Sequence, residues 1–477
     1  MSWLGSKRLS LTWVRSERAG RALLKAGVDL SQGPIGRHLV NLTVPMFLGI
    51  SSMIVASMVD TIYVGWLGTL ELAAVSFSFP IVMAMATISM GIGIGAASII
   101  ARVVGSGDSE RVRRLATDGL FLVAVLVVVL SIVCISFLDP LFSLLGAQEE
   151  ILPLAKAYME VWLLGLPAFA LPMVATNIMR AVGNAKLPGI IMSAGAGMQI
   201  VLGPILIFGI PGHWEGWGIV GAAWSFVISR SLAFVYTAFV LRRMKLLTAK
   251  VEAWEVHRDS WHEILKIGVP SMMTNLIGPV SMAIVVAMLA DYGHQVVAGF
   301  GVAFRIESLA TMVVMSVSAS TGPFVGQNWG AGAHERIYRA QSLGFRFSHG
   351  YSLLAFALLA GFGRYLVGLI IDDQVVVDAT YAYLLIVPAS YGFLGVGAVA
   401  ASTFIALGKP MPTLVLSLVR MLVLFVPLAV LLEVGLGSWG IYAAIAVCNL
   451  VLGVWSVMWV RAMLRREIER HSVLAAA

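Results

Sequence analysis

The sequence predicts an all-α membrane protein with twelve transmembrane helices in two like-oriented six-helix lobes related by pseudo-two-fold symmetry. Composition is the first reason, because 59% of the 477 residues are apolar and only 12% are charged, about half the usual charged fraction of a soluble domain. Long apolar runs recur along the chain, and the second half of the chain repeats the first. Soluble enzymes, disordered chains and disulfide scaffolds are excluded by this composition.

The apolar runs are long enough to be helices that cross a bilayer, which requires about 20 residues each. They lack the two-residue alternation of barrel strands. The spans predicted in the first half are 38–66, 71–103, 115–138, 154–182, 187–209 and 217–241. Those predicted in the second half are 263–290, 295–328, 341–371, 378–407, 410–433 and 438–461.

Basic residues gather at the ends of the even-numbered spans, as Arg102 and Arg242 do, whereas the opposite loops carry acids such as Glu149 and Asp372. Because short cytoplasmic loops are enriched in Lys and Arg, we expect both termini on the cytoplasmic side of a bacterial-type inner membrane. Topology then accounts for the net charge of +7, and no nucleic-acid partner is expected.

Polar stretches divide the chain into five regions. A basic segment precedes the first span, a hydrophilic linker separates the halves, and a short tail follows the last span. The predicted regions are the basic cytoplasmic segment 1–37, the N-terminal lobe 38–241, the cytoplasmic linker 242–262, the C-terminal lobe 263–466 and the cytoplasmic tail 467–477.

An internal repeat relates the two halves at an offset of 225 residues, with positions 45–114 lying over 270–339 without a gap. The matched pairs include Pro45 and Pro270, Gly68 and Gly293, Gly107 and Gly332, and Gly183 and Gly408. Since each half holds an even number of spans, both halves have the same orientation in the membrane. This architecture favours a secondary transporter over a channel, a receptor or a membrane enzyme.

Prolines and glycines within the spans indicate bends and close helix packing. Proline removes a helical hydrogen bond and permits a kink, and Pro45 and Pro427 are two of several in the spans. Gly91, Gly93 and Gly95 in the second span allow neighbouring helices to approach closely.

Several motifs follow one another in a characteristic order. They are Val59-Asp60-Thr61, Glu71-Leu72-Ala73-Ala74-Val75, the run from Ala101 to Asp108, Arg305-Ile306-Glu307-Ser308-Leu309 and the run from Val325 to Gly332. Together they resemble the multidrug and toxic compound extrusion (MATE) family over nearly the whole chain. The major facilitator class, which also has two six-helix halves, is disfavoured because Ser109 interrupts its loop signature after Asp108.

Asp60 is the main functional candidate. A carboxylate within a membrane span is costly and usually functional, and the family resemblance places its coupling carboxylate here. Protonation of Asp60 removes a charge that binds a cation, so a proton and a cationic substrate would compete for one site. Ser57 and Tyr63 lie on the same helical face, and we expect them to line the pocket.

Span 5 departs from the family pattern. The resemblance implies an Asn-x-x-x-Asp pair there, and the matching residues are Gln199 and Gly203. Gln199 keeps an amide, but Gly203 has no carboxylate, which disfavours proton sharing between two acids. Asn177 on span 4 is a further pocket candidate, or alternatively makes an interhelical hydrogen bond.

The second half contains fewer acids within its spans than sodium-coupled relatives have, since span 7 has none before Asp291. Protons are therefore favoured over Na⁺ as the coupling ion, and Na⁺ stays an alternative. No metal site and no cofactor are expected.

Four further charged residues fall within spans: Arg230, Arg305, Glu307 and Arg420. Because buried charges need partners, we expect a buried network in which Glu307 pairs with Arg420 or Arg230. The alternative is a charged cavity that suits anionic or zwitterionic substrates.

Taken with the resemblance, these features predict a secondary antiporter that exports small amphipathic, cationic organic compounds. Export is expected to be driven by proton influx through alternating access, in a monomer that contacts membrane lipids. A Na⁺-coupled drug antiporter and a flippase of lipid-linked sugars from the same superfamily are the alternatives. An enzyme is not expected, because we find no nucleophile with a base and no paired histidines.

Overall fold

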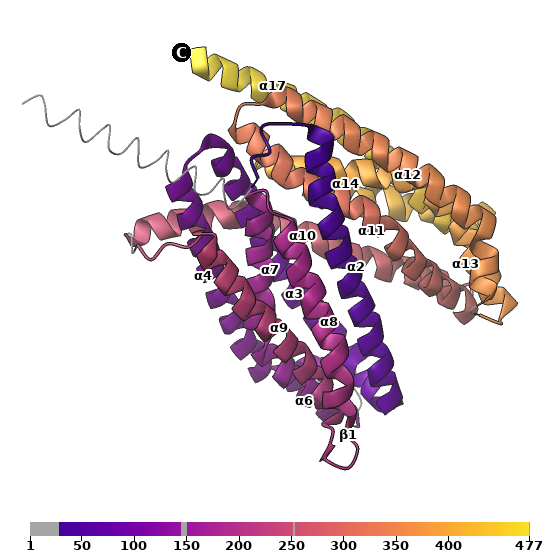
Figure 1. Cartoon of the computed structure of the whole chain (residues 1–477). Coiled ribbons are helices and arrows are strands. Elements are labelled where there is room, and N and C mark those ends of the chain that lie inside the picture. The colour runs from indigo at the N-terminus through magenta and orange to yellow at the C-terminus, as the bar shows by residue number, and fades with distance from the viewer. Residues whose placement is uncertain (1–27, 145–149, 251–252, 370, 477) are drawn as a thin grey trace, which may run out of the picture. The chain divides into compact units, whose positions relative to one another are not determined.

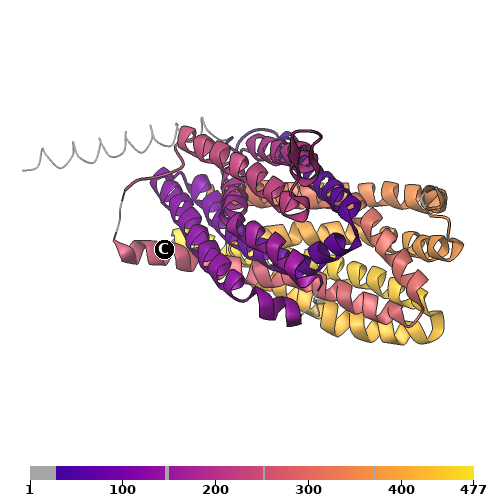
Figure 2. The same cartoon turned by 90° about the horizontal axis from the view of Figure 1, so that it is seen from below.

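The computed structural model describes residues 28–144, 150–250, 253–369 and 371–476. This part of the chain is almost entirely helical, as Figure 1 and, turned by 90°, Figure 2 show. It contains 11 helices that are long and apolar enough to cross a membrane, or 12 when one bent pair is counted as a single span. The predicted all-α, twelve-span fold is therefore confirmed. Most of the predicted basic segment 1–37 lies outside the described residues.

The first half of the described chain forms eight helices and one short hairpin. The helices are α2 (Ile35–Leu67), α3 (Thr69–Ser106), α4 (Ser109–Ser136), α5 (Leu138–Leu144), α6 (Leu152–Leu164), α7 (Leu166–Ala181), α8 (Lys186–Phe208) and α9 (Gly218–Arg243). Strands β1 (Gly209–Ile210) and β2 (Trp214–Glu215) pair antiparallel between α8 and α9 (Figure 1).

The second half follows the same plan. Its elements are α10 (Trp254–Ala290), α11 (His294–Gly330), α12 (His334–Gly368), α13 (Gln374–Ile386), the 3₁₀-helix η1 (Val387–Ser390), α14 (Tyr391–Ala406), α15 (Met411–Leu418), the π-helix η2 (Val419–Phe425), α16 (Val426–Leu436) and α17 (Ser438–Ala476). The predicted tail 467–477 thus continues the helix of the last span as far as it is described.

Three spans are interrupted. The fourth is divided into α6 and α7, which are bent by 48° at Gly165. The tenth passes through η1, whose Pro388 lacks the N–H that a continuous helix uses. The eleventh contains η2, a π-helical turn that includes Arg420. The fourth and tenth spans are repeat equivalents, so the two halves share a break at the same place.

The turns between helices give the repeat structural support. Gly183 and Gly408 both have positive φ, 88° and 76°, a conformation that favours glycine. In these turns the Asn184 N–H donates to the Met179 carbonyl oxygen and the Lys409 N–H donates to the Phe404 carbonyl oxygen, each at 2.9 Å. The matched glycines are therefore explained by the same helix-ending turn in each half.

The described chain divides into two compact units. Unit 1 comprises residues up to Leu30 together with Val44–Met272, and unit 2 comprises Ser31–Thr43 together with the residues from Met273 onward. The division therefore falls within α2 and α10 instead of in the predicted linker 242–262. In each of these helices it lies within three residues of a repeat-equivalent proline, Pro45 or Pro270, where a helical hydrogen bond is missing.

Helix α10 packs tightly on α3 in unit 1. A Cβ atom built at Gly268 of α10 would lie 2.9 Å from the carbonyl oxygen of Gly91, and one at Gly95 would contact the backbone of Ile264 and Gly268. Gly93, between them, faces the side chain of Asn177 on α7. The predicted glycine-mediated packing of the second span thus brings two helix backbones into contact.

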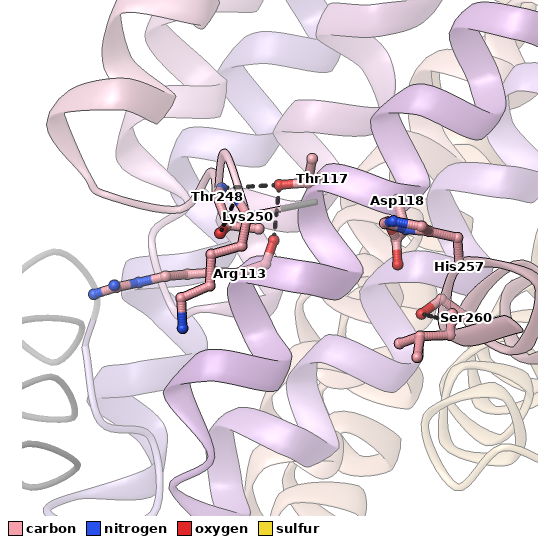
Figure 3. Close-up of polar contacts among 8 residues, drawn as sticks. Arg113, Thr117, Asp118, Thr248, Lys250, His257 and Ser260 are labelled. Carbon is pink, nitrogen blue, oxygen red and sulfur yellow. Dashed lines mark hydrogen bonds and ion pairs between the residues drawn. The ribbon is translucent and has the colours of Figure 1, made fainter. Parts of the chain in front are cut away.

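Polar contacts join the beginning of α10, and Thr248 before it, to α4 (Figure 3). His257 Nδ1 lies 2.7 Å from Oδ1 of the buried Asp118, and the Thr248 N–H donates to the Thr117 hydroxyl at 3.0 Å. Arg111 forms an ion pair with Glu263 at 3.1 Å. These contacts hold the first half of α10 in unit 1.

The short N-terminal segment of unit 2 is bound by residues far along the chain. Arg336 donates to the carbonyl oxygen of Gly33 at 2.8 Å, and the Thr43 hydroxyl donates to the Ser320 hydroxyl at 3.1 Å. An apolar core elsewhere in unit 2 includes the nearly fully buried tyrosines Tyr383, Tyr391 and Tyr442.

Candidate functional site

The Asp60 carboxylate is the centre of a polar group in unit 1. It lies in α2 and accepts a side-chain hydrogen bond from Gln199 of α8, and its charge interacts with Arg230 of α9. Its charge also acts on Tyr158 of α6, a buried residue. Four helices thus meet at one carboxylate, and we call Asp60, Gln199, Arg230 and Tyr158 the Asp60 site.

Arg230 is held in place from two sides. Its guanidinium donates a long hydrogen bond to Gln199 Oε1 at 3.5 Å. It also lies 5.2 Å from the centre of the Phe226 ring, a favourable cation–π geometry. Phe226 in turn stacks on the buried Trp162 at 5.5 Å. The arginine therefore supplies a fixed positive charge beside Asp60.

Tyr63 fills the space opposite Gly203. A Cβ atom built at Gly203 would lie 2.9 Å from the Tyr63 ring, and the Tyr63 hydroxyl donates to the Ile200 carbonyl oxygen at 3.4 Å. The ring also packs against Trp66 and Phe208. The absence of a carboxylate at position 203 is thus matched by an aromatic ring that occupies the space such a side chain needs.

Two predicted pocket residues, Ser57 and Asn177, have no hydrogen bond to Asp60, Gln199 or Arg230 among the described residues, and their place in the pocket stays a prediction. Ser57 is exposed, and its carbonyl oxygen accepts a hydrogen bond from Thr61 at 2.9 Å. Asn177 is buried and bonds to the Met173 carbonyl oxygen and to Arg180 of its own helix. Asn177 therefore forms hydrogen bonds within α7. The alternative expected from the sequence is a hydrogen bond between helices.

The expected charge network is separated between the units. In unit 2, Glu307 accepts a hydrogen bond from Tyr383, and its charge interacts with Arg420. Arg230 belongs to unit 1 with Asp60. The expectation that Arg305 is buried is wrong, because Arg305 is exposed. It precedes Glu307 by two positions, which places the two side chains on different faces of α11.

Sequence reasoning missed Tyr158 and Phe226. An aromatic residue in a wholly apolar span looks the same whether it faces lipid or a polar site. One signal was present: Tyr158 lies at the repeat offset of 225 from Tyr383, and each of these tyrosines interacts with a carboxylate of its unit.

Comparisons with known proteins find matches to both halves of the chain. The MatE family model matches residues 45–205 and 270–431. The FAD transporter of Shewanella oneidensis is 35% identical over 426 residues, which are 89% of this chain and 94% of that protein. The multidrug export protein MepA of Staphylococcus aureus is 23% identical over 372 residues, 77% of this chain and 80% of that protein.

Among solved structures, the bent form of the Vibrio cholerae MATE transporter VcmN superposes with a TM-score of 0.86 at 27% identity. The match covers 94% of this chain and 99% of the VcmN chain. The similarity therefore extends over both halves of the described fold.

Proposed function

The chain belongs to the multidrug and toxic compound extrusion family, and from this premise we propose that it is an antiporter that exports small organic compounds in exchange for protons. Asp60 is the coupling carboxylate. The observation that carries the proposal is the position of this carboxylate within a span, bonded to Gln199 and facing Arg230. We place the protein in the inner membrane with both termini cytoplasmic, by the distribution of basic residues.

The chemistry of the Asp60 site suits exchange of one proton. When Asp60 is ionised, it accepts a hydrogen bond from Gln199 and balances the charge of Arg230. When it is protonated, Arg230 loses its counter-charge, and a buried charge without a partner is costly. Proton binding therefore changes the interactions among α2, α8 and α9, which is what a coupling site requires.

Protons are favoured over Na⁺ by the same arrangement. A sodium ion at the Asp60 carboxylate would lie near the fixed positive charge of Arg230, which opposes a second cation. A proton binds covalently to the carboxylate and leaves only the arginine charge. The Na⁺-coupled alternative thus requires Arg230 to move away.

The cargo has two candidates. Small amphipathic cations are the first candidate, and the multidrug export protein MepA among the relatives supports an organic cargo. A flavin dinucleotide is the second candidate, favoured by the Shewanella FAD transporter and by a positive charge in the site that suits an anionic group. Ionised Asp60 attracts a cationic substrate against the same repulsion from Arg230 that opposes Na⁺, whereas Arg230 attracts an anionic one.

Transport by inverted membrane vesicles that contain the protein tests the coupling. We expect a proton gradient to drive uptake of ethidium or FAD in the wild type and a protonophore to abolish it. Asp60→Asn should abolish gradient-driven uptake at normal expression. Asp139→Asn is the matched control, because Asp139 is an exposed carboxylate paired with Lys156 at 2.8 Å. Undiminished uptake by Asp60→Asn contradicts the mechanism.

The same vesicles decide between the two cargoes. Uptake of ethidium with no competition from excess FAD supports cationic export. Uptake of FAD with no uptake of ethidium supports the dinucleotide. Replacing the proton gradient by a Na⁺ gradient in each case identifies the coupling ion, since sustained uptake would refute proton coupling.

A further inference from the structure

Unit 2 contains its own carboxylate within a span, which the mechanism above does not use. Glu307 of α11 accepts a hydrogen bond from the Tyr383 hydroxyl of α13. Its charge interacts with Arg420 of η2 and with Tyr391 of α14. The carboxylate thus has one hydrogen-bond donor, one positive charge and one further tyrosine around it, contributed by three neighbouring elements.

The other titratable groups near Glu307 are neutral side chains from α12 and α17. Tyr351 of α12 donates its hydroxyl to the Ala310 carbonyl oxygen at 2.8 Å, so it is already engaged. Tyr442 of α17 packs edge-on against Tyr383 at 5.2 Å between ring centres, and Cys448 of α17 is buried. Among the described groups, Arg420 of η2 is the positive charge that acts on Glu307.

Two of the surrounding tyrosines have buried hydroxyls without a hydrogen-bond partner in the described residues, namely Tyr391 and Tyr442. Their residues are 1% and 0% exposed. Buried polar groups are nearly always bonded in native structures, and exceptions often mark a functional site. These hydroxyls lie in the same apolar core as Tyr383, which donates to Glu307.

The backbone at Arg420 is also unusual. Arg420 lies in the π-helical turn η2, between α15 and α16. Single π-turns inside helices are rare and occur frequently at functional sites. Pro427 follows shortly after and cannot donate a helical hydrogen bond. Arg420 is therefore the charged residue of an irregular helical segment, and its charge interacts with Glu307.

The two units have the same composition of polar groups, assembled differently. Each pairs a carboxylate, a tyrosine and an arginine: Asp60, Tyr158 and Arg230 in unit 1, and Glu307, Tyr383 and Arg420 in unit 2. The tyrosines are repeat equivalents at an offset of 225. The carboxylates are on α2 and α11, which are not equivalent helices of the repeat. The carboxylate of unit 2 is therefore not the repeat equivalent of Asp60.

We propose that Glu307 is a second proton-binding site, which exchanges one proton per transport cycle in addition to the proton at Asp60. The ionised carboxylate takes up a proton from water on the side where protons enter, and its interaction with Arg420 is weakened. The proton is lost to water on the opposite side, and the pairing is restored. The proposal rests on proton-coupled transport at Asp60 and extends it to two protons in each cycle.

Infrared difference spectroscopy of the full chain in lipid membranes tests this directly, with the proton itself as the probe. Spectra taken at acidic and alkaline pH report the C=O stretch of protonated carboxyl groups in apolar surroundings. We expect two such bands in the wild type. Glu307→Gln should remove one band and Asp60→Asn the other, while Asp378→Asn should remove neither, because Asp378 is an exposed residue paired with Arg364 at 2.8 Å.

A second variant keeps the test decisive if Glu307→Gln does not fold. Tyr383→Phe removes the hydroxyl that donates to ionised Glu307 and keeps the ring. We expect one band to persist to higher pH, since the ionised form has lost a donor. Tyr351→Phe is the matched control, because its hydroxyl binds a backbone carbonyl oxygen, and it should leave that band at its original pH.

The outcomes separate this proposal from the first. Loss of a band in Glu307→Gln, or its shift in Tyr383→Phe, supports a second proton site. A wild-type spectrum with a single band that disappears in Asp60→Asn shows that Glu307 does not change its protonation between the two pH values, and the proposal is overturned while coupling at Asp60 stands. A band that is lost in Glu307→Gln while Asp60→Asn transports normally refutes the role of Asp60 instead.

Discussion

The contact between α3 and α10 makes an unusually sharp prediction, because the same substitution at two helical positions of unit 1 should have opposite effects. Gly268→Ala adds a methyl group 2.9 Å from the Gly91 carbonyl oxygen and 3.3 Å from its carbonyl carbon. Both atoms belong to the backbone and cannot rotate away. Gly197→Ala, in the interior of α8, meets nothing within 4 Å.

The magnitudes follow from two opposing terms. Alanine is favoured over glycine in a helix by about 0.5–1 kcal/mol, which benefits both variants. Overpacking a tight contact costs about 1–3 kcal/mol, which affects Gly268→Ala alone. We therefore expect Gly197→Ala to raise the free energy of unfolding by about 0.5–1 kcal/mol and Gly268→Ala to lower it by about 1 kcal/mol.

The assay is unfolding of the purified protein in mixed micelles by increasing SDS, followed by tryptophan fluorescence. Comparing two variants of one unit cancels effects of micelle composition. If Gly268→Ala is as stable as Gly197→Ala, the close approach of α3 and α10 does not exist in the native protein.

Two further predictions concern other contacts in unit 1. Asp118→Ala should lower the free energy of unfolding by about 1–3 kcal/mol, because His257 loses its partner at 2.7 Å. The control Ser260→Ala removes only a local bond to the Val256 carbonyl oxygen and should change the free energy of unfolding by less than about 0.5 kcal/mol. Equal effects of the two substitutions would contradict the importance of the Asp118–His257 pair. Gly203→Asp should reduce the yield of folded protein in the membrane, because a Cβ atom at position 203 lies 2.9 Å from the Tyr63 ring. Adding Tyr63→Ala to the same chain should restore the yield, which fluorescence size-exclusion chromatography measures. If the yield is not restored, lack of space is not the cause.

The spans could be predicted from the sequence because hydropathy alone identifies them. Their interruptions could not. Gly165 and Pro388 mark two of the breaks, but glycines and prolines also occur within spans that stay helical, such as Pro80 in α3. The π-helical turn at Arg420 has no residue signature, since its geometry depends on how the neighbouring helices pack.

The site was predicted in part. Asp60 and Gln199 were singled out separately, and the structure joins them. Asn177 was grouped with them because it is polar, yet it bonds within α7. In a helix that is apolar on all sides, periodicity does not reveal which face meets another helix and which meets lipid. Arg305 illustrates the same limit, because hydropathy places it in a span but not on its exposed face.

Unit 2 includes the segment 31–43, although the rest of it begins at Met273, and this order has a consequence for biogenesis. During translation this segment leaves the ribosome long before the residues that bind it. Arg336, which bonds to the Gly33 carbonyl oxygen, is made 303 positions later. Closing so long a loop costs little more entropy than closing one half its length, so the delay is kinetic. One of the first described segments to be synthesised therefore takes part in one of the last steps of assembly.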